Sequence, residues 1–303
     1  MLTSIATAAF ALAGLLFSAP LSYAASAVRV GLIDLGIERT DFSKLENVTV
    51  RTMTFWTSGT SEARKQDKQH ARNHGEEMVN SLVASFRAVD PTTPIIVYVA
   101  TPFHADTKTG ALSLNMDELN YAYNWFAHEG VRIIGETFVG PDSDEQHAAL
   151  RRATSLGLVV LASAGNGPSH NAVPPFPAAY DESISISTTE LSAELSRERD
   201  RDSYVDFSVA PKSISAIAYR NDPEVSSLLG SSAATATATG ILSALSLRST
   251  LKDRADAVMV LGCVARPAAS FAAGRAWGNG VLVPREIGTK LRGQNTHPCG
   301  EAT

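Results

Sequence analysis

The feature that most constrains the fold is a regular alternation between short apolar runs and longer, more polar segments with helical spacing. The apolar runs are typical of strands buried on both faces, and each polar segment can return the chain to the start of the next strand. Repeated βαβ units predict an α/β fold of three layers, with a mostly parallel central sheet flanked by helices. The alternation covers residues 28–34, 75–86, 95–100, 116–129, 131–134, 144–155, 158–163 and 183–188, and an Ala-rich helix from Ser232.

Length and charge narrow the classes of function. The chain of 303 residues is long enough for one large α/β domain with a sizeable core. A net charge of −5 provides no basic patch for nucleic acid and no polybasic membrane signal. A Rossmann-like nucleotide binder is also disfavoured, because no Gly-x-Gly-x-x-Gly follows the first strand.

Residues 1–24 are typical of a secretory signal peptide. An apolar run over 5–17 is followed by Ser22-Tyr23-Ala24, a small-x-small cleavage site. We expect cleavage after Ala24, export to the periplasm or the medium, one domain over 25–290 and a polar tail over 291–303. No Lys or Arg precedes the apolar run, so an uncleaved anchor or a buried helix is the alternative. Beyond this leader, no stretch is apolar enough to span a membrane.

The two cysteines are Cys263 and Cys299. In the oxidising compartment that the leader implies, they can form a disulfide, and closing that interval contributes about 3–4 kcal/mol in the chain-entropy model. Two unpaired thiols are the alternative that the sequence leaves open.

The first strand ends in a carboxylate and a glycine turn, in the sequence VGLIDLGI at 30–37. Functional residues of parallel sheets gather beyond the carboxyl ends of the strands, so Asp34 is placed where an acid can be held beside a base. An Asp followed by glycine is also a common turn former or helix cap. This segment alone therefore does not decide the role of Asp34.

His74 precedes Gly75 and apolar residues with helical spacing, which predicts a helix over 75–86 with His74 at its start. A ring nitrogen can then point outward as a base. His70, His74 and Glu77 would share one face of a continuous helix, so the metal site of a metal-dependent hydrolase is a second interpretation. Gly75 argues against a continuous helix there, and a plain surface histidine is a third interpretation.

Two further segments place polar side chains beside glycines. Asn166 follows the apolar strand over 158–163 and lies between glycines, where it is either a turn residue or a donor to a developing oxyanion. Ser231 and Ser232 begin an Ala-rich helix that we expect to end near Leu247. A helix N-terminus favours a nucleophile through its dipole and its free N–H groups, although any helix can begin with a serine cap.

Together these segments resemble the subtilisin-like serine proteases, or subtilases, in the chain order Asp, His, Asn, Ser. The resemblance extends over about 28–283 and includes a closing strand at 278–282. It therefore implies a subtilisin-like version of the α/β fold. The motifs that carry it are Asp34-Leu35-Gly36-Ile37, His74-Gly75, Ala164-Gly165-Asn166 and Gly230-Ser231-Ser232-Ala233-Ala234.

The resemblance implies a serine endopeptidase that hydrolyses polypeptide substrates. Ser232 would attack the scissile carbonyl, His74 would accept its proton, and Asp34 would orient the imidazole ring. Asn166 and the backbone N–H of Ser232 would hold the oxyanion. The metal interpretation loses weight under this assignment, because a histidine bound to zinc cannot accept the serine proton.

The resemblance also implies a substrate-binding surface, and departures from the family pattern modify it. Val139 stands where the family usually has glycine, so we expect the primary specificity pocket to favour small or medium apolar side chains. Glu77 and Ala236-Thr237 replace a His and a Pro-His, which predicts different helix packing behind the site. The substrate-binding residues implied are Thr137, Phe138, Val139, Ala162, Ser163, Ala164 and Gly165.

No cofactor is identified, and calcium enters only through the family resemblance, because no acidic loop of this sequence matches a family calcium site. Few residues separate the leader from the first strand, which leaves no room for an inhibitory propeptide. We therefore expect unaided folding or a separate folding or activating partner. A catalytically weak subtilase fold acting as a binding module is the alternative function, although retention of all four polar groups argues against it.

Overall fold

The computed structural model describes ten stretches of the chain: residues 27–37, 42, 45–55, 64–105, 112–166, 175–189, 204–210, 230–267, 278–292 and 297–300. The side chains of residues 54, 64–73 and 105 lie outside this description. The expected signal peptide over 1–24 also lies outside it.

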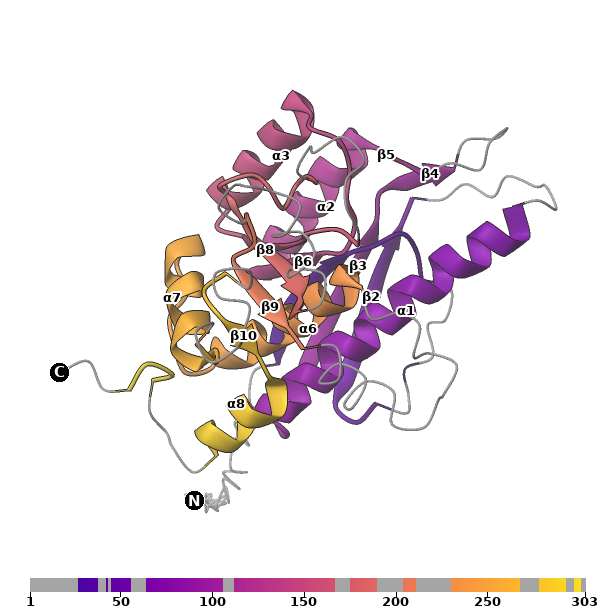
Figure 1. Ribbon diagram of the computed structural model, residues 1–303. Helices are drawn as coiled ribbons and strands as arrows, with labels where there is room; N and C mark the ends of the chain where they lie inside the picture. Colours follow the sequence, from indigo (N-terminus) through magenta and orange to yellow (C-terminus); the bar gives the residue numbers. More distant parts are fainter. Residues whose placement is uncertain are drawn as a thin grey trace, which may run out of the picture.

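Within the described residues, a parallel sheet of eight strands forms the centre of the structure (Figure 1). The strands follow the order β10-β9-β8-β7-β6-β1-β3-β2, and every neighbouring pair is parallel. This confirms the predicted fold class. The strands are β1 (Val28–Ile33), β2 (Val48–Thr54), β3 (Ile95–Thr101), β6 (Ile133–Glu136), β7 (Val159–Ser163), β8 (Ser183–Thr188), β9 (Phe207–Val209) and β10 (Val281–Leu282).

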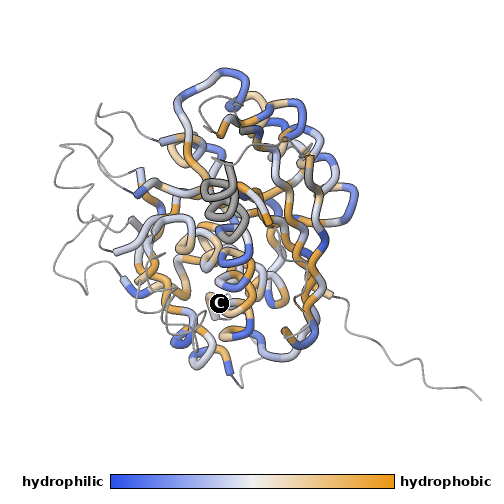
Figure 2. The backbone as a smooth tube through the Cα atoms, turned by 90° about the vertical axis from the view of Figure 1, so that its right-hand side faces the viewer, coloured by the Kyte–Doolittle hydropathy of each residue, from blue (hydrophilic) through white to orange (hydrophobic). Residues whose placement is uncertain are grey.

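Helices cover both faces of this sheet, and the strands between them form the hydrophobic interior in Figure 2. One apolar cluster joins the sheet to α1 (Arg64–Val89), α6 (Ser231–Leu245), α7 (Arg254–Val264) and α8 (Pro284–Leu291). A second cluster joins the other face to α2 (Met116–His128) and α3 (Asp144–Ser155). A separate antiparallel hairpin consists of β4 (Phe103–Ala105) and β5 (Leu112–Leu114).

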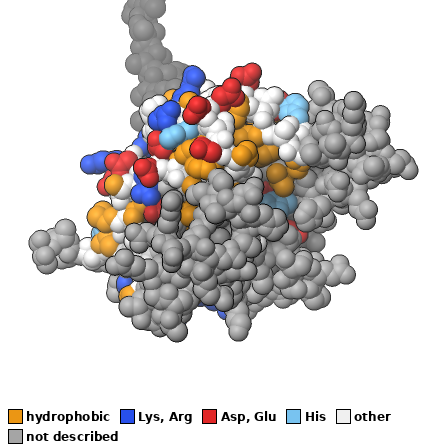
Figure 3. All heavy atoms as spheres, turned by 45° about the horizontal axis from the view of Figure 1, so that its top comes forward, with side chains coloured by type: hydrophobic (Ala, Val, Ile, Leu, Met, Phe, Trp, Pro, Cys, Tyr) orange, Lys and Arg blue, Asp and Glu red, His pale blue; other side chains and the backbone are white. Residues whose placement is uncertain are grey.

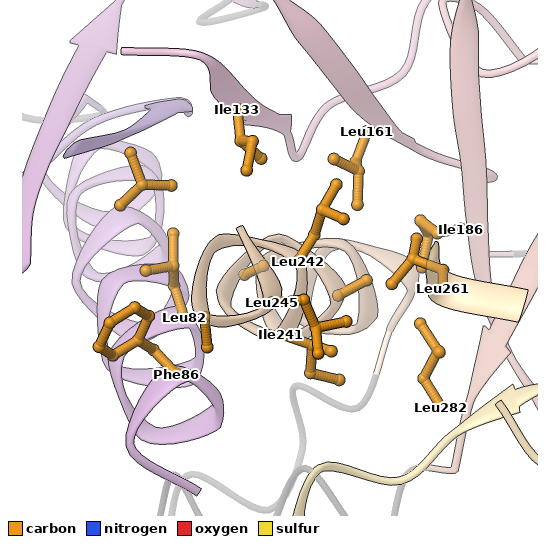
Figure 4. Close-up of a cluster of buried hydrophobic side chains, with 14 of the residues drawn as sticks. Leu82, Phe86, Ile133, Leu161, Ile186, Ile241, Leu242, Leu245, Leu261 and Leu282 are labelled. Atoms are coloured by element: carbon orange, nitrogen blue, oxygen red, sulfur yellow. The ribbon is translucent and has the colours of Figure 1, made fainter. Parts of the chain in front are cut away.

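Helix α6 is the most enclosed of these elements. Ser232 is its one residue that is not buried. Leu242 points toward Ile133 and Leu161 of the sheet, and Leu82 and Phe86 of α1 lie beside the same helix (Figure 4). The many Ala, Ser, Thr and Gly residues of α6 let it fit between α1 and the sheet, so its first turn is held firmly at the edge of the sheet.

Several helix starts follow from capping residues in the sequence. Asn115 accepts a hydrogen bond from the backbone N–H of Glu118 at the start of α2, at 3.1 Å. Ser143 accepts one from Gln146 at the start of α3, and Asp253 accepts one from Asp256 at the start of α7. Such side chains satisfy N–H groups that have no partner within the helix.

The predicted start of the histidine-bearing helix was wrong. α1 begins at Arg64, so His74 lies within the helix and Gly75 does not interrupt it. A Cβ atom at position 75 would lie 1.9 Å from the carbonyl oxygen of Gly36. Glycine is therefore needed for close contact between α1 and the turn after β1, and this contact outweighs its poor helix propensity of about 1 kcal/mol.

Cys263, near the end of α7, and Cys299 form a disulfide across 36 residues. Of the two alternatives that the sequence left open, the structure contains the bridge. Among the described helices, none combines the length and apolar character needed to cross a bilayer. On the face shown in Figure 3, acidic, basic and hydrophobic side chains are interspersed over its described part.

Candidate active site

Three strands and one helix converge at the carboxyl edge of the sheet. Asp34 follows β1, Thr137 follows β6, and Asn166 lies three residues beyond β7. β1 and β6 are neighbours, with Ile33 opposite Glu136, so Asp34 and Thr137 leave the sheet side by side. The first turn of α6, with Ser231 and Ser232, meets the same edge through hydrogen bonds to Asn166 and Thr137.

Asp34 is fully buried and receives several hydrogen bonds. The backbone N–H of Leu35 donates to its Oδ1 at 2.7 Å, and the hydroxyl of Thr137 donates to its Oδ2. Nδ1 of His74 lies 2.9 Å from both carboxylate oxygens. An ionised carboxylate only accepts hydrogen bonds, so Nδ1 carries the hydrogen. In the neutral ring Nε2 is then left as a proton acceptor.

The environment of His74 shifts its proton affinity. Burial by itself lowers the pKa of His74, but the charge of Asp34, the hydrogen bond from Nδ1 and the charge of Glu77 together outweigh burial. The pKa of His74 therefore lies above its ordinary value of 6.5. A base that is strengthened in this way suits proton transfer near neutral pH.

Ser232 occupies the second position of α6, where the backbone N–H has no acceptor within the helix. Its hydroxyl donates to the carbonyl oxygen of Thr137 at 2.9 Å. Thr137 thus contacts Asp34 through its side chain and Ser232 through its backbone. Hydrogen bonds therefore connect His74 to Asp34, and connect Asp34 through Thr137 to Ser232, whose hydroxyl is directed at the Thr137 backbone oxygen.

Asn166 binds the start of α6 through its side-chain oxygen. Oδ1 accepts hydrogen bonds from the backbone N–H of Ser231 at 2.7 Å and from its hydroxyl at 2.8 Å. Gly230, the N-cap residue, has no side chain to provide this cap. Asn166 therefore caps α6 from a different part of the chain.

The residues predicted to bind substrate differ widely in exposure. Thr137, Ala162, Ser163 and Ala164 are buried. Phe138 is buried against Phe103, with ring centroids 5.1 Å apart and nearly perpendicular planes. Val139, by contrast, has 49% of its surface exposed.

Val139 extends toward the glycine at 165. A Cβ atom at position 165 would lie 4.0 Å from Cγ1 of Val139. The same atom would lie 3.3 Å from Cγ of Pro175. Two backbone hydrogen bonds join Gly140, which follows Val139, to Phe176, which follows Pro175. Val139 and Pro175 therefore border one space beside Gly165.

The sequence reasoning missed a buried polar pair behind the site. Glu136 is fully buried on β6, and the hydroxyl of Tyr123 donates to its Oε1 at 2.5 Å. Burial raises the pKa of Glu136 to about 7, although the Tyr123 hydrogen bond opposes this shift. A charged residue at the end of an apolar strand was the available signal.

The described part of the chain contains no cluster of side chains that would support the metal-site interpretation. There, no group of three His, Cys, Asp or Glu side chains is arranged to hold a metal ion. His74 directs Nδ1 at Asp34. The side chain of His70 lies outside the described residues.

Several solved structures have a similar fold. A PatG macrocyclase in complex with peptide is 14% identical, with a TM-score of 0.53 over 88% of this chain and 92% of that chain. The epidermin leader peptide processing serine protease of Staphylococcus aureus is 15% identical, with a TM-score of 0.57 over 88% and 76%. Fervidolysin of Fervidobacterium pennivorans, a keratinolytic enzyme related to subtilisin, is 15% identical, with a TM-score of 0.60 over 88% and 43%.

The three-layer parallel fold is thus that of the subtilisin-like proteases. The family model of the subtilases matches residues 25–253, and the chain belongs to the subtilase family. No curated protein matches the sequence.

Proposed function

We propose that the chain is a serine endopeptidase with Asp34, His74 and Ser232 as its triad and Asn166 as an oxyanion donor. The observation that carries the proposal is the buried Asp34 carboxylate, which lies 2.9 Å from Nδ1 of His74 and is joined to Ser232 through Thr137. An imidazole held in this tautomer presents Nε2 as a base, which an activated serine requires.

The reaction begins with a change of hydrogen-bond partner. The Ser232 hydroxyl leaves the Thr137 carbonyl oxygen, and Nε2 of His74 accepts its proton while Oγ attacks the substrate carbonyl carbon. Asp34 stabilises the imidazolium, and the protonated ring then gives its proton to the leaving amine. A water molecule, deprotonated by the same histidine, hydrolyses the acyl-enzyme and regenerates the hydroxyl.

The oxyanion of each tetrahedral intermediate needs donors that are already in place. The backbone N–H of Ser232 is available because it lies in the first turn of α6. Because Oδ1 of Asn166 is bound to Ser231, its Nδ2 is the atom that donates to the oxyanion.

The substrate side chain next to the scissile bond is small or of medium size and apolar. The support is Val139, whose Cγ1 restricts the space beside Gly165. A peptide library would contradict this if large aromatic or charged side chains were preferred at that position.

Export of the protein is the second part of the proposal. The apolar leader and the disulfide between Cys263 and Cys299 both fit an oxidising compartment. Detection of a mature chain that begins at Ala25 in the periplasm or the medium would support it, and an uncleaved chain that stays inside the cell would contradict it.

Labelling with a fluorophosphonate probe tests the chemistry. We expect the purified mature chain to label, Ser232→Ala to lose labelling, and the control Ser155→Ala, at an exposed serine of α3, to label like the wild type. Failure of the wild type to label would contradict an active triad and favour the alternative, a subtilase fold that binds peptides without cleaving them.

A further inference from the structure

Ser163 and Ser231 form a buried hydrogen-bonded pair beside the oxyanion donor. Ser163 ends β7 and Ser231 begins α6, and their hydroxyl oxygens lie 2.6 Å apart. Both residues are essentially without exposed surface. Two hydroxyl groups from distant parts of the chain thus meet in the core, and both need partners there.

The direction of the hydrogen bonds follows from a count of protons. Each serine hydroxyl has one proton. The hydroxyl of Ser231 donates to Oδ1 of Asn166 at 2.8 Å, so it is the acceptor in its contact with Ser163. The order is therefore Ser163 to Ser231 to Asn166, and in such a chain each bond strengthens the next.

The orientation of the Asn166 amide is fixed by the same contacts. The backbone N–H of Ser231 can only donate, and it lies 2.7 Å from the side-chain oxygen of Asn166. A flipped amide would direct Nδ2 at this N–H group and at the Ser231 hydroxyl. The flip would lose both bonds as they stand and turn Oδ1 toward the oxyanion.

Gly230 allows the amide to lie this close to the helix start. A Cβ atom at position 230 would lie 2.7 Å from both Oδ1 and Nδ2 of Asn166. The amide is therefore packed against bare backbone on one side and held by Ser231 on the other.

We propose that Ser163 and Ser231 are positioning residues that hold Asn166 with Nδ2 directed at the substrate oxyanion. The inference rests on the proposed protease function and deepens it. Neither hydroxyl needs to contact substrate. Ser163 acts through Ser231, and Ser231 acts through the amide oxygen, so the pair changes the rate of acylation and leaves substrate affinity unaltered.

The test compares side chains of matched shape at position 231. Ser231→Thr keeps the hydroxyl, and Ser231→Val replaces it with a methyl group in the same outline. We expect Ser231→Thr to retain the wild-type rate of fluorophosphonate labelling, and Ser231→Val to lose about tenfold or more. With a tri-alanine p-nitroanilide, the loss should fall on kcat and leave KM unchanged.

Ser163→Ala should slow labelling by about fivefold, the usual effect of one lost hydrogen bond. A double-mutant cycle shows whether it acts through Asn166. In an Asn166→Ala background, Ser163→Ala should have no further effect. An undiminished effect in that background would overturn the inference, and so would equal rates for Ser231→Thr and Ser231→Val.

The two levels of the proposal fail differently. If the wild type labels but the variants at positions 163 and 231 do not change the rate as expected, the positioning role is wrong and the protease function stands. If wild type neither labels nor cleaves the p-nitroanilide, the protease function fails, and the positioning role fails with it.

Discussion

Replacing Glu136 by Gln should change how the stability of the protein depends on pH. Burial raises the pKa of Glu136 from an ordinary 4.5 to about 7 in the folded protein. Between these values the folded chain binds a proton that the unfolded chain has lost, so stability falls as pH rises through this window. Since a tenfold difference in proton affinity is worth about 1.4 kcal/mol, the total loss is about 3 kcal/mol.

The amide introduced by Glu136→Gln would remain neutral throughout and can still accept the hydrogen bond of Tyr123. The stability advantage of this variant over the parent should therefore grow by about 3 kcal/mol between pH 4.5 and pH 8. Urea unfolding followed by circular dichroism measures this growth, with both proteins in a Ser232→Ala background that lacks the proposed nucleophile. Glu145→Gln, at an exposed position of α3, is the control and should show no such growth. If the free energy of unfolding changed with pH equally in Glu136→Gln and its parent, the raised pKa of Glu136 would be refuted.

Further measurements address the site itself. Because the pKa of His74 is raised and a base must be neutral, kcat/KM should fall with decreasing pH around a midpoint above 6.5. A flat pH profile of kcat/KM from pH 5 to 8 would count against His74 as the base. Gly75→Ala should lower stability by about 2–3 kcal/mol in thermal unfolding, since its Cβ would lie 1.9 Å from the Gly36 carbonyl oxygen; an unchanged melting temperature would contradict this contact. Val139→Gly should widen the accepted side chains toward large apolar ones in a peptide library, and an unchanged preference would show that Val139 does not limit the pocket.

The regular part of the fold was predictable because burial on both faces leaves a clear apolar pattern. β3 and β8 are such strands, and the α3 helix was placed at its observed bounds. β2 was missed because it is an edge strand, VTVRTMT, that contains no continuous apolar run. β9 was missed because a strand of three residues carries no periodicity, whereas β10 lies within the closing strand at 278–282 that the family resemblance implied.

For the candidate site, the sequence indicated which residues to expect at one edge of the sheet and did not indicate which hydrogen bonds they form. Parallel strands place Asp34 and Asn166 at one edge of the sheet, which the order of the elements implies. The hydrogen bond from the Ser232 hydroxyl to the Thr137 carbonyl oxygen depends on the side-chain torsion of Ser232. The residues next to Ser232 in the sequence do not determine that torsion. The helical context of His74 was misread because a contact with the Gly36 carbonyl, distant in sequence, explains Gly75.

The disulfide determines what a cut in the backbone near the C-terminal end would do to the molecule. Residues 263–299 form a covalent ring that contains β10 and α8. β10 pairs with β9 through two residues, Val281 opposite Ser208 and Leu282 opposite Val209. One cut anywhere inside the ring leaves both fragments linked through sulfur. A nicked molecule would therefore keep its last strand and helix until the bridge is reduced, and nicking there would be visible only on a reducing gel.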